Sequence, residues 1–250
     1  MKIVDMVLSG GRTGFFFDDQ RAIKHGAPAD GSAYLGDPET KGFVSIRQPG
    51  ESISVMLILD DGQVAYGDCA AVQYSGCGGR DPLFLAEDYI PVIEKAVRPL
   101  IIGREADSFR KLAAETEAVR VEGRPLHTAA RYGVSQAILD AVAKSRKLLM
   151  CEVVAEEYGT TVSDKMIPIF TQSGDNRYDN ADKMILKGAD VMPHGLINNV
   201  ETKLGRDGEK LVEYIEWLRR RIEKLRVRDS YQPVLHIDVY GTIGLLFGNE

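Results

Sequence analysis

The stretch Gln232-Pro-Val-Leu-His-Ile-Asp-Val-Tyr-Gly241 decides the fold of the C-terminal part of the chain. Between its proline and its glycine lie four strand formers, which predict a short buried strand: Val234, Leu235, Ile237 and Val239. Asp238 stands near the end of this strand, where a carboxylate needs a cation or hydrogen-bond donors. At the C-terminal mouth of a (β/α) barrel it would be placed for chemistry; the alternative is an Asp that caps the following turn.

The composition is that of an ordinary globular protein. The chain has 250 residues, 44% hydrophobic and 27% charged, enough for one large domain or two smaller ones. The net charge of −6 argues against a general nucleic-acid binder. No apolar run approaches the roughly 20 residues of a membrane-spanning helix. We therefore expect a protein that binds neither nucleic acid nor membrane.

The three cysteines, Cys69, Cys77 and Cys151, are an odd number without metal-type spacing. They indicate free thiols in a reducing compartment, so we expect a cytoplasmic location.

The first seventy residues alternate like an antiparallel meander. The pattern predicts strands at residues 2–8, 43–47, 52–59 and 64–70, with Gly10–Asp30 as a glycine-rich and polar connection. Gln48-Pro49-Gly50 and Asp60-Asp61-Gly62 supply the turns between the later strands.

A glycine-rich loop follows, from Gln73 to Gly79. It matches neither a P-loop nor a GxGxxG strand–helix junction. Such a run is more commonly a mobile surface loop; the functional alternative is a loop that folds over a ligand, with Gln73 reaching it.

Four helices are predicted next, at residues 82–97, 108–121, 128–147 and 150–157. Asp81 is expected to cap the first of them, and Gly159 ends the fourth. The third is rich in small residues, which favours close packing against another element. The polar run Thr160–Lys165 predicts a boundary between a domain at 1–160 and another at 161–250.

Beyond that boundary, strands alternate with helices. Strands are predicted at Ile167–Ser173, at Asp190–Pro193 and in the opening stretch, with helices at 180–187 and 206–227. This alternation predicts βα units and a parallel sheet. Each strand ends in a polar residue, namely Gln172, His194 and Asp238, and such ends meet at one barrel mouth. Taken singly, Gln172 is more commonly a loop amide and His194 a structural histidine. Their common placement at the strand ends favours a functional site.

Several long motifs resemble the methylaspartate ammonia-lyase family of the enolase superfamily. They are Phe17–Ile23, Gly67–Gly76, Gly79–Ala86, Gln172–Asp179, Pro193-His194, Leu196–Glu201 and His236–Gly244. The resemblance covers nearly the whole chain. It implies an α+β capping domain at 1–160 and the start of an α/β (TIM-type) barrel at 161–250, incomplete in this chain.

The resemblance also implies an activity. Members of this family are carbon–nitrogen lyases that eliminate ammonia reversibly from 3-methylaspartate to give mesaconate, in amino-acid degradation by glutamate fermentation. Mg²⁺ assists proton removal next to a carboxylate, and a monovalent cation such as K⁺ is a second candidate cofactor. By resemblance, Asp238 is a metal ligand, His194 an acid, base or stabiliser, and Gln172 and Gln73 hydrogen-bond the substrate. A homodimer is implied.

The chain departs from the family pattern in one respect. The family's remaining metal carboxylates and its lysine base match no residue before Glu250. We therefore expect activity only with the C-terminal barrel half, and an inactive, aggregation-prone chain without it. Two alternatives stay open: a non-catalytic subunit that binds a partner polypeptide, and another enolase-superfamily lyase.

Overall fold

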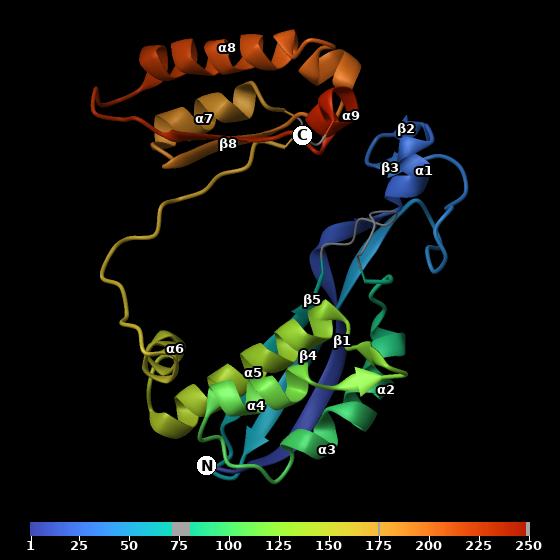
Figure 1. Cartoon of the computed structure of the whole chain (residues 1–250), viewed down its shortest axis with the longest axis vertical. Coiled ribbons are helices and arrows are strands. Elements are labelled where there is room, and N and C mark those ends of the chain that lie inside the picture. The colour runs from blue at the N-terminus through green and yellow to red at the C-terminus, as the bar shows by residue number, and fades with distance from the viewer. Residues whose placement is uncertain (72–80, 175, 249–250) are drawn as a thin grey trace. The chain divides into compact units, whose positions relative to one another are not determined.

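The chain is seen in a computed structural model that describes residues 1–71, 81–174 and 176–248. Its contacts divide it into two compact units, Met1–Ser163 and Asp164–Glu250 (Figure 1). Within the described ranges, no helix has the length and apolar character needed to span a membrane.

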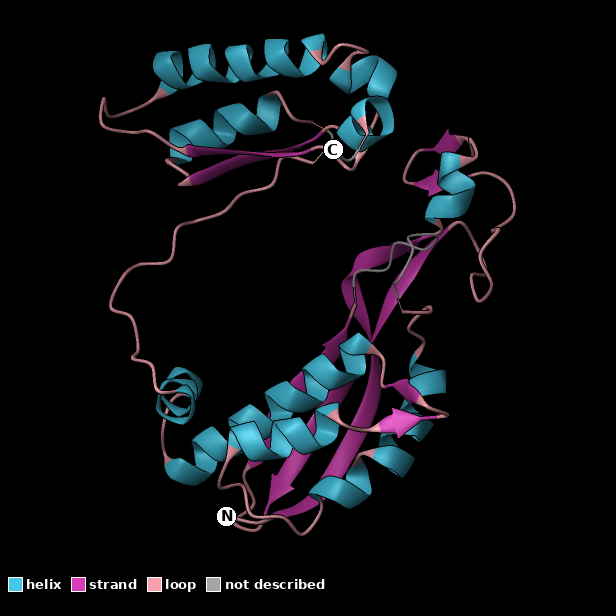
Figure 2. Cartoon of the chain, viewed as in Figure 1, coloured by secondary structure: helices cyan, strands magenta, loops and turns pink. Residues whose placement is uncertain are grey.

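The first unit is built on a three-stranded antiparallel sheet. Its strands are β1 (Ile3–Asp18), β4 (Arg47–Leu59) and β5 (Val64–Ala70), in the order β1-β4-β5 (Figure 2). The predicted meander and the hairpin at Asp60–Gly62 are confirmed. Between β1 and β4 lie a short helix and a small hairpin: α1 (Gln20–Lys24), β2 (Ala29–Asp30) and β3 (Ala33–Tyr34).

Two strand predictions in this sheet are wrong. β1 runs on to Asp18, and β4 begins at Arg47 and passes straight through Pro49 and Gly50, where a turn was expected. The reason is a bulge at residues 13–15 of β1 that packs on Gly50, where a Cβ would lie 2.4 Å from Thr13 Oγ1. Proline is tolerated there because β5 pairs with β4 only from Ser52 onward.

Helices follow the sheet in chain order. They are α2 (Ala86–Ala96), α3 (Arg98–Ile101), α4 (Phe109–Glu117), α5 (Thr128–Arg146) and α6 (Met150–Tyr158), with a hairpin of β6 (Arg120–Val121) and β7 (Arg124–Pro125). α4, α5, α6 and the Gly159 cap match the predictions, except that α4 ends before the hairpin. Asp81 was wrongly expected to cap α2: its carboxylate instead accepts the Thr128 N–H at 2.8 Å, where α5 starts.

Close packing of α5 on β5 forms the core of this unit. A Cβ on Gly67 would lie 2.1 Å from the Gly133 carbonyl oxygen, and one on Gly133 would lie 2.4 Å from the Cys69 nitrogen. Only glycine fits at these two positions, which confirms the prediction from the small residues. Burial raises the pKa of the Cys69 thiol to about 12, so this thiol is unreactive.

His127 is a buried histidine at the N-terminus of α5. Its Nε2 lies 3.0 Å from the Pro82 carbonyl oxygen, while its Nδ1 accepts the Ala129 N–H at 3.0 Å. The rings of Phe84 and Tyr89 pack against it. These contacts suit the neutral ring with its proton on Nε2. Burial lowers the pKa of His127, outweighing the nearby Asp81 carboxylate, which acts in the opposite direction.

This burial predicts a pH-dependent stability. In the unfolded chain His127 titrates near its usual pKa of about 6.5, whereas in the folded unit its pKa is lower. Between these two pKa values, His127 binds a proton in the unfolded chain but not in the folded unit. The stability present above pH ~6.5 is therefore lost as the pH falls toward the folded value. His127→Asn keeps a capping oxygen but cannot titrate in this range. Thermal unfolding between pH 7 and 5 should show the wild type losing more stability than this variant. Equal losses of stability would show that His127 does not cause the pH dependence.

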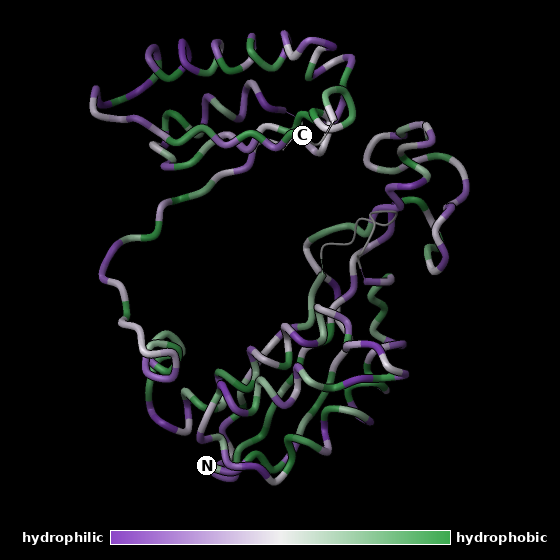
Figure 3. Tube along the Cα trace, in the orientation of Figure 1, coloured by the Kyte–Doolittle hydropathy of each residue, from purple (hydrophilic) through white to green (hydrophobic). Residues whose placement is uncertain are grey.

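The second unit is a small parallel sheet with helices on one face. β8 (Val191–Leu196) pairs in parallel with β9 (Val234–Asp238), and residues 169–174 run beside β8. The helices are α7 (Asp179–Lys187), the π-helical turn η1 (Val200–Leu204), α8 (Glu209–Leu225) and α9 (Thr242–Phe247). The apolar side of α8 faces α7 and the strands (Figure 3), and its Tyr214 and Leu218 are buried with Met192 of β8.

Three predictions for this unit need correction. Residues 167–173 form only isolated bridges with β8 rather than a full strand, although Thr171 and Ser173 donate backbone hydrogen bonds to it. β8 does not end before His194 but continues to Leu196. β9 forms as predicted but is not buried, since Val234 is 64% exposed. The helices cover one face of this sheet, and Val234 lies on the other.

Candidate functional site

Polar side chains gather on the face of the second sheet that the helices leave open. On β9, Ile237 packs into the core with α7 and α8, so alternation turns His236 and Asp238 to the opposite face. Phe170 contacts the rings of both His194 and His236, each at 5.3 Å between centroids. Gln172, two residues after Phe170, therefore shares this open face with both histidines.

His194 reaches the open face through a β-bulge. Met192 points into the core, so regular alternation would turn His194 toward the helices as well. The register instead pairs Pro193 with His236 and Gly195 with Ile237, which leaves His194 as the extra residue. Its φ is +45°, a left-handed conformation that costs a histidine of order 1–3 kcal/mol. Gly195 then packs against Tyr214, where a Cβ would lie only 3.0 Å from the ring.

The side chain of His194 makes two polar contacts. Its Nδ1 lies 2.9 Å from Nδ1 of His236, and its Nε2 lies 3.6 Å from Oδ2 of Asp238. The other carboxylate oxygen of Asp238, Oδ1, accepts the Tyr240 N–H at 3.0 Å. Asp238 thus caps the following turn with one oxygen, as the plainer alternative expected, while the other oxygen faces His194.

The sequence also predicted two glutamines as site residues, Gln172 and Gln73. Gln172 is exposed on the open face, and Gln73 lies outside the described residues. His236 was not assigned a role from the sequence, although its position two residues before Asp238 puts both on one strand face. Throughout the described ranges, no group of three or more His, Cys, Asp or Glu side chains could hold a metal ion. Among the described residues, the carboxylate beside His194 on the open face is that of Asp238.

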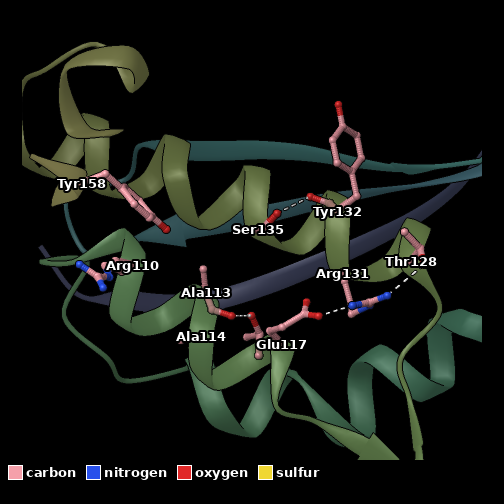
Figure 4. Close-up of a pocket in the computed structure, with 10 residues that line it drawn as sticks. Arg110, Ala113, Ala114, Glu117, Thr128, Arg131, Tyr132, Ser135 and Tyr158 are labelled. Atoms are coloured by element: carbon pink, nitrogen blue, oxygen red, sulfur yellow. Dashed lines mark hydrogen bonds and ion pairs between the residues drawn. The ribbon is translucent and has the colours of Figure 1, made fainter. Parts of the chain in front are cut away.

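A separate hollow of about 490 Å³ lies between α4, α5 and the end of α6 (Figure 4). Several of its polar groups bond to one another, although the buried Nε of Arg131 has no hydrogen-bond partner among the described residues. Arg131 pairs with Glu117 and donates to Thr128 Oγ1, and Ser135 donates to the Tyr132 carbonyl oxygen. Because Arg131, Glu117 and Ser135 are engaged within the hollow, and His194 and Asp238 meet on the open face of β8 and β9, that open face is the better candidate.

Two family models match the chain end to end. The model described as the N-terminus of methylaspartate ammonia-lyase matches residues 1–159, and the model described as its C-terminus matches residues 161–250. The chain belongs to the methylaspartate ammonia-lyase family. The motifs quoted from the sequence therefore identified the family correctly.

Among the similar curated proteins is methylaspartate ammonia-lyase of Clostridium tetanomorphum. It is 64% identical over 99% of this chain, which covers 60% of that protein. A crystal structure of the Clostridium enzyme as a magnesium complex matches with a TM-score of 0.91 at 64% identity. The structure from Citrobacter amalonaticus containing (2S,3S)-3-methylaspartic acid matches with a TM-score of 0.94 at 57% identity. In both, the match covers 99% of this chain and 60% of the solved chain.

A more distant neighbour supports the fold alone. The dipeptide epimerase of Methylococcus capsulatus has a TM-score of 0.58 at 16% identity, over 96% of this chain and 54% of the epimerase. An enolase-like fold, as the sequence suggested, fits these neighbours. The chain spans about 60% of the length of the family members that it matches.

Proposed function

We propose that the chain contributes the first part of a methylaspartate ammonia-lyase, which eliminates ammonia reversibly from 3-methylaspartate to give mesaconate. The observation that carries the proposal is the grouping of His194 and Asp238 on the open face of β8 and β9, in a chain 64% identical to an enzyme of that name. The substrate class follows from the Citrobacter relative, whose structure contains (2S,3S)-3-methylaspartic acid.

Asp238 fits the role of one magnesium ligand. Mg²⁺ prefers carboxylate oxygens in an octahedral shell and gives up its water reluctantly. Oδ2 of Asp238 faces the open side of the sheet, while Oδ1 is held by the Tyr240 N–H. When bound, the ion would stabilise the negative charge that develops on a substrate carboxylate. One carboxylate alone is a weak site, so we propose that further ligands come from polypeptide outside this chain.

His194 would exchange a proton with the substrate or stabilise its charge. Its imidazole lies on the open face with 17% of its side chain exposed, and its Nδ1 is engaged by His236, so Nε2 is the nitrogen left for chemistry. Gln172 and Gln73 would hydrogen-bond the substrate, since an amide can donate to a carboxylate and accept from an ammonium group.

The open face of β8 and β9 has features that further polypeptide would cover. Val234 and Phe170 expose apolar side chains there, at 64% and 51%, and β9 leaves an edge that no described residue pairs. We propose that residues 1–160 form a capping domain, and that residues 161–250 begin a barrel which the rest of the family's length closes. A homodimer, a cytoplasmic location and a monovalent cation such as K⁺ belong to the same proposal.

The proposal is tested with the complete protein, meaning this chain joined to the part of its relatives that it does not cover. 3-Methylaspartate and other amino acids should be compared by the ultraviolet absorbance of the conjugated diacid formed. Turnover should be greatest with 3-methylaspartate and should require Mg²⁺. Preference for another amino acid would overturn the assigned substrate.

Gln172→Ala should weaken catalysis in the same assay. Removing an amide that pairs with a bound carboxylate or ammonium should cost about 1–3 kcal/mol of transition-state stabilisation, read from kcat/KM. Gln232→Ala is the matched control, because Gln232 is an exposed glutamine that precedes β9 at its other end. An unchanged kcat/KM for Gln172→Ala would remove Gln172 from the substrate site.

A further inference from the structure

His236 has no role from the family match or from the sequence motifs, yet its ring contacts that of His194. The two Nδ1 atoms are 2.9 Å apart, a hydrogen-bond distance. The rings are nearly parallel, at 18°, with centroids 4.9 Å apart. The nitrogen separation is much shorter than the centroid separation, so the two Nδ1 atoms lie on the facing sides of the rings. At this distance an imidazole N–H of one ring can donate to the imidazole nitrogen of the other.

The surroundings keep the two rings in this arrangement. Phe170 meets both rings edge-on, at 67° to His194 and 83° to His236. His194 is held in the bulge with φ +45°, and His236 pairs with Pro193, the residue before it. The backbone that turns His194 to the open face thus also brings it beside His236.

We propose that His236 is a positioning residue, which engages Nδ1 of His194 so that His194 meets the substrate through Nε2 in a fixed ring orientation. This inference rests on the proposed function, because it assigns His236 a role only through His194. An orienting carboxylate or carbonyl can only accept a hydrogen bond. A neutral imidazole nitrogen can either donate or accept, so His236 can support His194 with its Nδ1 protonated or unprotonated.

The single proton between the two Nδ1 atoms has a spectroscopic consequence. Whichever ring donates carries its proton on Nδ1, and the ring that accepts is neutral with its proton on Nε2. Nitrogen NMR of the complete protein, labelled in histidine, should therefore show one of these two rings with Nδ1–H. The signals are assigned by their loss in His194→Gln and in His236→Phe. Finding Nδ1 unprotonated in both rings would overturn the inference, whether or not the protein turns over methylaspartate.

The kinetic test compares two substitutions of His236 in the complete protein. His236→Phe keeps a ring but removes Nδ1, and should lower kcat by about tenfold to a hundredfold, as for other groups that orient a functional imidazole. KM should change little, because the group acts through His194 and not on the substrate. His236→Asn restores a donor and acceptor near the Nδ1 position and should recover part of the loss. Glu216→Ala, on an exposed side of α8, is the control.

A double-mutant cycle separates positioning through His194 from a general structural role. In a His194→Gln background, His236→Phe should cause no further loss of kcat, because the partner is already gone. Additive losses, or wild-type kcat in His236→Phe while His194→Gln is impaired, would overturn the inference and leave the proposed function standing. Absence of methylaspartate turnover in the wild type would instead overturn the proposed function, and the NMR result then decides whether His236 engages Nδ1 of His194.

Discussion

His194→Ala in the complete protein should lose activity while keeping its fold. Positioned proton transfer typically contributes 10²–10⁴-fold to a rate, so kcat should fall by about that factor. The stability should change little, because His194 lies on the open face and is not part of the core around Met192 and Tyr214. The measurement is kcat for 3-methylaspartate together with the melting temperature, which should stay within a few degrees.

A second variant, His194→Asn, separates loss of the imidazole from loss of stability. His194→Asn also removes the imidazole, but asparagine tolerates the left-handed backbone better than most residues. It should be as inactive as His194→Ala and at least as stable. A histidine with a purely structural role would show the reverse, with activity retained and the melting temperature lowered. That outcome would remove His194 from the site.

The second large effect concerns the chain without further polypeptide. Among the described residues, Asp238 is the carboxylate on the open face, and no group of three or more His, Cys, Asp or Glu side chains could hold a metal ion. Such a site should hold Mg²⁺ weakly, because the ion would have to keep most of its water. Substrate and metal would also meet an open face rather than a closed, water-excluding mouth. We expect no measurable turnover from this chain alone, and full activity once the remaining length of the family is supplied.

Exposed apolar residues predict that the isolated chain self-associates. Val234 and Phe170 on the sheet face, and Leu245 and Phe247 on α9, are each more than half exposed. An apolar face beside an unpaired strand edge favours self-association. The isolated chain should therefore aggregate more readily than the complete protein, which sedimentation at matched concentrations would measure.

Local patterns were enough to predict many elements of the fold. The hairpin at Asp60–Gly62, the helix from Thr128 and the cap at Gly159 depend on turn chemistry, periodicity and small residues, which a sequence displays directly. The strand through Pro49-Gly50 was missed for a physical reason. Its proline and glycine usually mark a turn, and the bulge that accommodates Gly50 comes from β1, some 35 residues earlier.

The site was predictable in part. Asp238 and His236 share a strand face by simple alternation, so that pair was readable from the sequence. The placement of His194 was not, because alternation from the buried Met192 would have turned it toward the helices. Only the bulge, visible in the register of β8 with β9, brings it to the open face. The contact between the two histidines depends on that tertiary detail.

Mesaconate formation by the chain alone and by the reconstituted protein shows whether residues 1–250 need further polypeptide for activity. Residues 1–250 are assayed with 3-methylaspartate and millimolar Mg²⁺, first alone and then after refolding with the polypeptide that corresponds to the rest of the family's length. We expect no absorbance change for the chain alone and Mg²⁺-dependent mesaconate formation for the reconstituted protein, abolished by His194→Ala. Clear turnover by a soluble chain of residues 1–250 would contradict this expectation, because the site would then be complete within these residues.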